Sequence, residues 1–377
     1  MDIRTLLNSR LLSHLRGNDR VYNLTGSSAA LLLALEPKPF AAIEKDNQSA
    51  EALKKDIEFY RTVFPGEKVC FIPDAEGPER SGERAAVLLS MRPEDSVVTS
   101  FQNLHAAFWD KELLDEQLIR VRRGEHLERA GFEEALVGLG YRAVAMVVEK
   151  GEYSKRGWIF DLFPSTSEYP VRVEFFGDDI ELLRMFDIGT QKSVQDIDEV
   201  TVFPAQEPEL SWSFTDIAGD RRYYCLFSPG KKDLLPEPLT YLSRYSFEAG
   251  TLPDEEPEET PGQMQQADAG LLAVRGLGIL PEERKSLDDM PRTIAKLSET
   301  YRVMIILPSA GQAERLRDLF RDKDIMLPAV ELKDLASFEG RLSVTQGKLS
   351  AGLYLEGLLI LTEREIFGER HIHRQQK

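Results

Sequence analysis

The feature that most constrains the fold is an alternation of short apolar runs and helix-like segments over the first hundred residues. The strand-like runs are Val21–Leu24, Phe40–Ile43, Val69–Ile72 and Ser96–Thr99. After the second run, Leu53, Ile57 and Tyr60 recur at spacings of three and four residues, which places them on one face of a helix. Strands that alternate with helices predict a parallel sheet covered by helices on both faces.

The pattern changes after about residue 125, where strand candidates follow one another with turns between them. These candidates are Ala143–Val148, Trp158–Phe163, Val171–Phe176 and Ile180–Leu183. Gly177-Asp178-Asp179 is suited to a hairpin turn, because Gly and Asp tolerate the backbone angles that such turns require. The sequence therefore predicts an antiparallel, β-rich domain inserted in the α/β fold.

The last third of the chain predicts a second, small α/β unit. A helix is expected at Pro291–Glu299 and strands at Val303–Leu307 and Leu358–Leu361. Ser309 and Gln312 have the spacing of a capping box, and Ala313, Leu316 and Phe320 form the inner face of the helix that follows. Before this unit, residues 253–261 hold five carboxylates and three prolines, a composition typical of a solvated linker.

These patterns divide the chain into six parts. The predicted parts are an α/β domain at 1–125, an antiparallel β-rich domain at 126–205, a shorter, poorly patterned region at 206–252, an acidic linker at 253–265, a small α/β domain at 266–370 and a tail at 371–377. The fold class is α/β.

The charge balance excludes some function classes. The 47 basic and 64 acidic residues give a net charge of −17, which disfavours wrapping a phosphate backbone. The longest strongly apolar run, Ala29–Leu35, is far shorter than the roughly 20 residues of a membrane span. The first residues lack the apolar core of a signal peptide, and two cysteines, Cys70 and Cys225, suit buried thiols. We expect a soluble cytoplasmic protein without a membrane partner.

A nucleotide loop could lie between the first strand and helix. Such a loop needs glycines around the phosphates, a Lys for the β/γ-phosphates and a Ser or Thr for Mg²⁺. Over residues 23–30 only Gly26 keeps its place, and Ala29 and Ala30 stand where Lys and Thr belong. We therefore expect neither ATP nor Mg²⁺ in this chain. His371 and His373 are without further ligands nearby in sequence, and we find no nucleophile motif.

Two surface features leave alternatives open. The cluster Arg120, Arg122, Arg123 and Arg129 is either a solvated face or a set of interdomain salt bridges, or else a phosphate-contacting patch. In the strand Val171–Phe176, alternation places Arg172, Glu174 and Phe176 on the wet face, since burying unpaired charge is costly. Phe176 then either forms an exposed binding site with Arg172, or tucks under the following turn while Arg172 pairs with Glu174.

The same region carries a family resemblance. Its segments are Arg156-Gly157-Trp158-Ile159-Phe160-Asp161-Leu162-Phe163-Pro164, Pro170-Val171-Arg172-Val173-Glu174-Phe175-Phe176-Gly177-Asp178-Asp179-Ile180-Glu181, Arg184-Met185-Phe186-Asp187 and Gln191-Lys192-Ser193. Together they resemble the domain shared by two bacterial repair proteins, the excision-repair protein UvrB and the transcription-repair coupling factor (Mfd). The resemblance extends over residues 1–205 and, less strongly, over 266–370. It implies that residues 206–252 are a second, shortened part of the first domain.

Three features favour the coupling factor over UvrB. The nucleotide loop is degenerate, as in the helicase-like N-terminal module of coupling factors, and the region after residues 100–104 lacks the Tyr-rich hairpin of UvrB. The segment 361–370 looks like the junction that precedes the RNA-polymerase-interacting domain of that family. The alternative is a UvrB-like, nucleotide-dependent DNA-binding subunit of excision repair.

The resemblance implies a binding role rather than catalysis. In the family the antiparallel domain binds UvrA, and the contact residues match Arg156, Arg172 and Phe176 here. The resemblance also implies a parent protein that is an ATP-driven DNA translocase, which displaces stalled RNA polymerase, binds double-stranded DNA and masks the UvrA-binding surface with a C-terminal domain. We expect this chain to correspond to the N-terminal part, with residues 266–370 as a domain of unknown role or an interdomain spacer.

Overall fold

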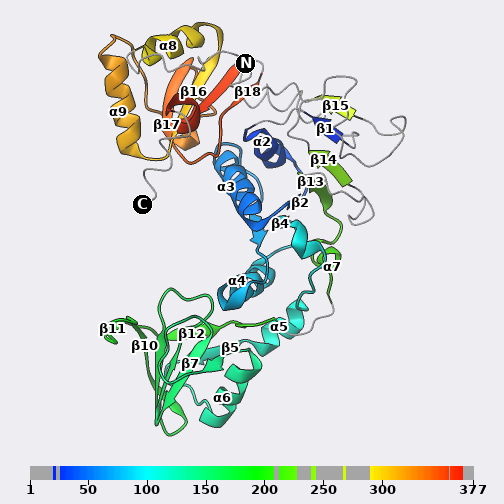
Figure 1. Ribbon diagram of the computed structural model, residues 1–377, viewed down its shortest axis with the longest axis vertical. Helices are drawn as coiled ribbons and strands as arrows, with labels where there is room; N and C mark the ends of the chain where they lie inside the picture. The colour runs from blue at the N-terminus through cyan, green and yellow to red at the C-terminus, as the bar shows by residue number, and fades with distance from the viewer. Residues whose placement is uncertain are drawn as a thin grey trace. The chain divides into compact units, whose positions relative to one another are not determined.

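The computed structural model describes residues 20–22, 26–207, 212–226, 239–242, 266–268, 289–355 and 357–367. It divides into two compact units (Figure 1). Unit 1 comprises Met1–Val69, Glu94–Val98 and Arg221–Lys377, and unit 2 comprises Cys70–Pro93 and Thr99–Asp220. Among the described residues no helix has the length and apolar character needed to cross a membrane. The predicted acidic linker at 253–265 and the tail at 371–377 lie outside the described residues.

The first sheet contains seven strands in the order β15-β1-β14-β13-β2-β4-β3. Their bounds are β1 Arg20–Tyr22, β2 Phe40–Glu44, β3 Val69–Ile72, β4 Ser96–Ser100, β13 Arg222–Cys225, β14 Leu239–Leu242 and β15 Gln266–Asp268. The pairs β15–β1, β1–β14, β14–β13 and β13–β2 are parallel, which confirms the predicted parallel sheet. Strands β13 and β14 come from the segment 206–252, so this part of the chain returns to the first sheet.

Helices α2 (Ser28–Leu35) and α3 (Asn47–Val63) connect the early strands. Helix α2 is buried from Ser28 to Ala34, as expected for a helix that is apolar on all sides. Helix α3 is amphipathic, and its buried face includes the predicted Leu53, Ile57 and Tyr60. It begins at Asn47, after the N-cap Asp46, whose side chain accepts a hydrogen bond from the Ser49 backbone N–H.

The C-terminal α/β domain of unit 1 has a four-stranded sheet in the order β17-β16-β19-β18. Its elements are α8 Met290–Thr300, β16 Arg302–Leu307, α9 Ala310–Arg321, a 3₁₀ helix η4 at Leu332–Asp334, β17 Leu342–Gln346, β18 Leu353–Leu355, β19 Leu358–Thr362 and α10 Glu363–Phe367. Helices α8 and α9 pack on one face of this sheet through Ile294, Leu316 and Phe320 (Figure 1). The predicted helix and strands are confirmed.

The capping box predicted at the start of α9 forms only in part. Ser309 Oγ accepts the Gln312 backbone N–H at 3.3 Å, as predicted. The Gln312 side chain does not return to the Ser309 backbone; its Oε1 accepts from Ser309 Oγ and its Nε2 donates to Glu363. A complete capping box occurs instead at Ser213 and Asp216, at the start of α7 (Phe214–Ala218).

Unit 2 contains a six-stranded sheet in the order β11-β10-β9-β8-β7-β6, antiparallel except between β6 and β7. Its strands are β6 Arg142–Ala143, β7 Glu152–Arg156, β8 Ile159–Leu162, β9 Val171–Phe176, β10 Asp179–Phe186 and β11 Ser193–Asp196, and β5 (Ile119–Arg122) pairs with β12 (Glu199–Val202) in a separate ribbon. Helix α6 (Arg129–Gly138) covers one face of the sheet through Phe132, whose ring packs against those of Phe160 and Phe175 at centroid distances of 5.2 and 6.1 Å. The predicted insertion of an antiparallel β-rich region is confirmed.

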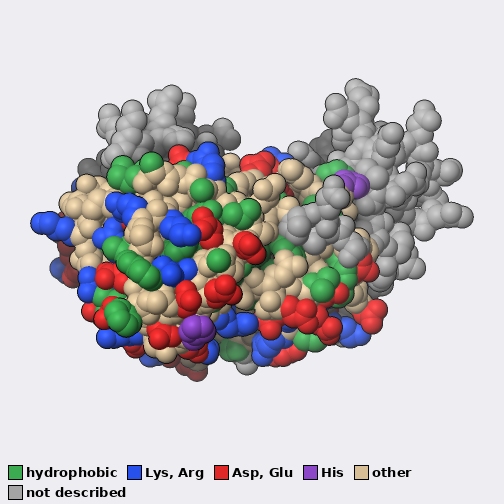
Figure 2. Space-filling view, turned by 90° about the horizontal axis from the view of Figure 1, so that it is seen from below, with side chains coloured by type: hydrophobic (Ala, Val, Ile, Leu, Met, Phe, Trp, Pro, Cys, Tyr) green, Lys and Arg blue, Asp and Glu red, His purple; other side chains and the backbone are tan. Residues whose placement is uncertain are grey.

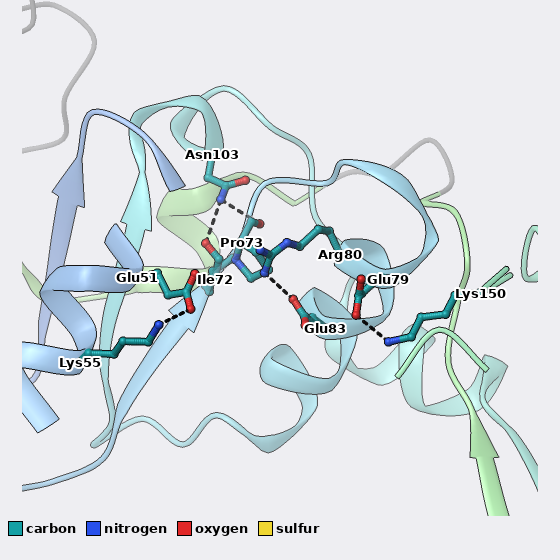
Figure 3. Close-up of polar contacts among 9 residues, drawn as sticks. All are labelled: Glu51, Lys55, Ile72, Pro73, Glu79, Arg80, Glu83, Asn103 and Lys150. Carbon is teal, nitrogen blue, oxygen red and sulfur yellow. Dashed lines mark hydrogen bonds and ion pairs between the residues drawn. The ribbon is translucent and has the colours of Figure 1, made fainter. Parts of the chain in front are cut away.

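The other elements of unit 2 are α4 (Gly77–Ser90), the 3₁₀ helix η1 (Phe101–Leu104) and α5 (Lys111–Gln117). The buried Asn103 of η1 donates from its side-chain amide to the carbonyl oxygens of Ile72 and Pro73, both at 3.1 Å (Figure 3). At the other end of this region an ion pair of 2.6 Å joins Lys150 to Glu79 of α4. The Asn103 bonds tie η1 to the end of β3, and the Lys150–Glu79 pair ties the antiparallel region to α4.

The strand predicted at Ala143–Val148 is largely wrong, because only Arg142 and Ala143 join the sheet. The backbone N–H groups of Val148 and Glu149 donate to the buried Glu152 carboxylate, each at 2.9 Å, and are therefore not available to a strand partner. The turn predicted at 177–179 is confirmed, since Phe176 pairs with Asp179 and Gly177 has a φ of +68°.

Candidate functional site

The three residues that the resemblance singles out lie on one face of the antiparallel sheet, opposite the side that packs on α6. On β9 the side chains of Val171, Val173 and Phe175 are buried, whereas Arg172 and Glu174 are half-buried and Phe176 is exposed. The alternation read from the sequence is therefore confirmed. We call this second side of the sheet the outer face.

Arg172 does not pair with Glu174, as one of the two sequence interpretations had it. Its Nε and Nη2 atoms donate to the two carboxylate oxygens of Asp161 at 2.6 and 3.0 Å. Asp161 lies directly opposite Arg172 on β8, and cross-strand neighbours are closer than residues two apart on one strand. The bidentate bonds to Asp161 raise the pKa of Arg172, and its guanidinium also stacks on Phe186, 4.7 Å from the ring centroid.

Arg156, at the end of β7, donates to the same Asp161 carboxylate. The Asp161 side chain is 3% exposed and the Arg156 side chain is 54% exposed. One buried carboxylate thus holds two guanidinium groups, of which Arg156 is open to solvent and Arg172 is mostly covered. Sequence reasoning did not single out Asp161; the register of the β8–β9 hairpin, which sets it opposite Arg172, is the signal that could have found it.

The outer face continues across β10 and β11 as a ladder of charges. Arg184 lies 3.4 Å from Glu174 on one side and 3.4 Å from Asp196 on the other. Phe176 ends this face at the hairpin tip with 77% of its surface exposed. It does not tuck under the turn, so the exposed arrangement is the one that the structure contains.

The basic cluster at 120–129 favours the salt-bridge interpretation. Arg120 pairs with Asp115 at 2.6 Å, Arg122 with Glu199 at 2.9 Å, and Arg129 with Asp178 at 3.1 Å. Figure 2 shows a face of the molecule on which basic and acidic side chains are interspersed and hydrophobic side chains stand singly or in small groups.

The position of the degenerate nucleotide loop is filled by the C-terminal domain of unit 1. Gly26 has a φ of +59°, and a Cβ atom placed on it would lie 2.1 Å from the carbonyl oxygen of Gly352. Ser27 Oγ forms a hydrogen bond of 2.7 Å with the hydroxyl of the buried Tyr60. One turn earlier on α3, Asp56 accepts a 2.9 Å bond from the Ser350 backbone N–H. The surface beside the loop therefore contacts protein backbone.

A cavity of about 430 Å³ lies in unit 1 at the start of β2 and β4. Its lining includes the cations Lys38 and Arg61 and the carboxylates Glu36, Glu67 and Glu94. Ligands of parallel α/β sheets bind at the opposite, carboxyl ends of the strands, and carboxylates outnumber cations here. The cavity therefore does not match a phosphate site.

Within the described residues no three His, Cys, Asp or Glu side chains cluster as metal ligands would. The thiols of Cys70 and Cys225 are buried and are not joined in a disulfide, as predicted. His371 and His373 lie outside the described residues.

Comparisons with known proteins find similarity in the region of the chain that contains this site. Residues 119–207 match the family described as the UvrB interaction domain. The chain is similar to the transcription-repair-coupling factor of Escherichia coli (strain K12), with 40% identity over 87 residues, which is 23% of this chain and 8% of that protein. The transcription-repair-coupling factor of Myxococcus xanthus is 28% identical over 224 residues, which is 54% of this chain and 19% of that protein.

The coupling factor of Mycobacterium tuberculosis (strain CDC 1551 / Oshkosh) is 32% identical over 216 residues, 51% of this chain and 17% of that protein. The matched part therefore spans less than a fifth of the length of each relative. The resemblance stated from the sequence is confirmed: residues 119–207 match the UvrB interaction domain family, and the chain is similar to transcription-repair-coupling factors.

Proposed function

We propose that this chain is the non-catalytic, UvrA-binding module of a transcription-repair coupling factor. The observation that carries the proposal is the outer face of the sheet. There the ring of Phe176 is exposed at the hairpin tip, and the solvent-facing Arg156 pairs with the buried Asp161, which also holds Arg172. Arginine and aromatic side chains are the types enriched among residues that dominate the binding energy of protein interfaces. The proposed contact residues are Arg156, Arg172 and Phe176.

The geometry assigns these residues different parts within that surface. Phe176 and Arg156 offer exposed atoms to a partner, whereas the Arg172 side chain is only 20% exposed and its donors are engaged by Asp161. Arg172 therefore acts partly through Asp161, which fixes the direction of Arg156.

The function of the whole protein is part of the same proposal. We infer a parent that is an ATP-driven DNA translocase of the cytoplasm, binds double-stranded DNA and displaces stalled RNA polymerase in transcription-coupled excision repair. ATP and Mg²⁺ belong to its translocase domains, and a C-terminal domain masks the UvrA-binding surface. The similarity to proteins named transcription-repair-coupling factors supports this assignment.

A UvrB-like subunit, the alternative, would bind nucleotide at the loop around Gly26. Mg-ATP at 100 times its Kd would then stabilise the chain by about 2.7 kcal/mol. The packing of Gly352 against Gly26 supports the opposite expectation, namely an unchanged melting temperature. A rise of several degrees with Mg-ATP, and none with Mg²⁺ alone, would favour the UvrB-like subunit.

The proposal is tested by titrating the chain with UvrA from the same source. Phe176→Ala should weaken binding by about 2 kcal/mol, or roughly 30-fold in Kd, because the exposed ring loses its contacts without disturbing a core. Met326→Ala is a matched control, since Met326 is an exposed hydrophobic residue (86%) at a distant position in the sequence. Equal affinities for the wild type and both variants, with their folds intact, would remove this assignment.

A further inference from the structure

The two most exposed aromatic side chains of the described residues stand at neighbouring hairpin tips. Phe176 is 77% exposed and Trp158 is 55% exposed, whereas the Phe, Trp and Tyr side chains at the other positions where the structure describes burial are buried or half-buried. Single exposed hydrophobic residues need no explanation. Two large aromatic rings in adjoining turns, next to a proposed binding face, form a shared feature of the surface.

The backbone places these two residues side by side. Trp158 follows Gly157 in the two-residue turn between β7 and β8, and its carbonyl oxygen accepts the Phe175 N–H at 2.9 Å. Phe176 is the next residue along β9. The strand pair Ile159–Glu174 continues the same ladder into the sheet. The Trp158 tip therefore adjoins the end of the outer face at Phe176, while the Trp158 ring itself, stacked on Arg129 of α6, lies toward the α6 side of the sheet.

A third residue holds the Trp158 ring in place. Arg129, the first residue of α6, has its guanidinium carbon 4.0 Å from the centroid of the Trp158 ring. Its Nε and backbone N–H also donate to Asp178 Oδ1, at 3.1 and 3.3 Å. Asp178 belongs to the turn after Phe176. One arginine thus links both tips, and a ring ordered in advance loses less entropy when a partner covers it.

We propose that Trp158 is a second aromatic anchor for the protein that docks on the outer face and reaches around its hairpin tips, with Arg129 as the positioning residue that orients the ring. This inference rests on the proposed function, so the partner is UvrA. Its complementary surface holds an apolar recess for the indole and, close by, carboxylates that meet Arg156. The second anchor lies at the tip of the β7–β8 hairpin, beyond the three residues already assigned.

The test measures UvrA affinity for the full chain and its variants. Trp158→Ala should raise Kd at least tenfold without a change in circular dichroism, and Trp158→Phe should retain most of the affinity. Arg129→Lys keeps the charge and loses the planar stack. It should raise Kd severalfold and increase the quenching of Trp158 fluorescence by acrylamide. The Trp158 signal is obtained by subtracting the fluorescence of the Trp158→Phe chain. If Arg129 only held Asp178 in place, the quenching of Trp158 would not change.

The outcomes separate this inference from the proposed function. If Phe176→Ala loses affinity while Trp158→Ala binds as the wild type does, the second anchor is wrong and the proposed function stands. If Phe176→Ala also binds normally, the proposed surface itself fails. If the Trp158→Ala chain does not fold, Trp158→Gln is used in its place, because Gln keeps a side chain over Arg129. A folded Trp158→Gln chain that binds UvrA with normal affinity would overturn the inference.

Discussion

At the scale of single residues, Asp161 is the group on which the outer face depends. It is nearly inaccessible to solvent, it lies between two strands that each carry an arginine, and it accepts hydrogen bonds from both. Buried carboxylates are stable only when they are paired and hydrogen-bonded. The Asp161 carboxylate therefore explains why two arginines can occupy one side of a sheet without repelling each other.

Replacing Asp161 should destabilise the fold as well as the surface. Hydrogen bonds to charged groups contribute about 1.5–3 kcal/mol each, so Asp161→Asn should lower the free energy of unfolding by about 2 kcal/mol or more. Glu174→Gln is the comparison, because Glu174 makes a single, longer ion pair with Arg184. Urea unfolding of both variants measures the difference. Equal losses would contradict the central place given to Asp161.

At the scale of elements, the sequence predicted features that depend on residues close in sequence better than features that depend on strand pairing. The alternation along β9 and the amphipathic face of α3 were readable because each depends on residues close in sequence. Strand β7 (Glu152–Arg156) was missed, since it carries three charged residues and is buried through Glu152 and Tyr153. The partner of Arg172 was also missed, because strand register, not local spacing, sets Asp161 opposite it.

Glu152 makes the β6–β7 region sensitive to acid. Burial alone would raise the pKa of its carboxyl, but the N–H groups of Glu149 and Val148 and the Arg142 guanidinium outweigh burial and leave the pKa below its ordinary value. A carboxyl whose pKa is lowered by folding stabilises the folded state fully at pH values above its pKa in the unfolded chain, which is about 4.3 for Glu. This contribution is lost as the pH falls through the lower pKa of the folded state.

The difference in free energy of unfolding between the wild type and Glu152→Gln should therefore be constant from pH 7 to 5 and should become smaller below about pH 4. Urea unfolding at several pH values measures it, with Glu149→Gln as a control because Glu149 is exposed and 3.8 Å from Arg142. A gap that stays the same at pH 3 would show that the Glu152 side chain stabilises the fold independently of its charge.

At the scale of the whole molecule, unit 1 joins two α/β domains that are far apart in sequence. The C-terminal sheet contributes Met304 and Ile360 to a cluster with Phe59 and Val63 of α3, and Asp56 binds Ser350. The sequence predicted both domains but not their contact, since nothing local to Gly26 indicates that Gly352 lies against it. Residues 289–367 thus cover the face where a nucleotide loop would lie.

Gly26→Ala tests this contact. An alanine at a positive φ costs about 1–2 kcal/mol, and here its Cβ would also meet the Gly352 carbonyl. Gly124→Ala is the control, because Gly124 has a φ of +81° and a Cβ atom placed on it would meet nothing within 4 Å. Gly26→Ala should lower the free energy of unfolding by more than the control does and speed amide exchange at residues 347–352. Equal effects would mean that the contact contributes nothing to stability.

The measurement that tests the central claim most directly is amide hydrogen exchange of the full chain with and without UvrA. The proposed docking surface predicts added protection at the hairpin tips and strand ends of β7–β10, around Arg156, Trp158 and Phe176, and little change in the C-terminal domain. Protection confined to unit 1, or no protection at a UvrA concentration that saturates binding, would contradict the account.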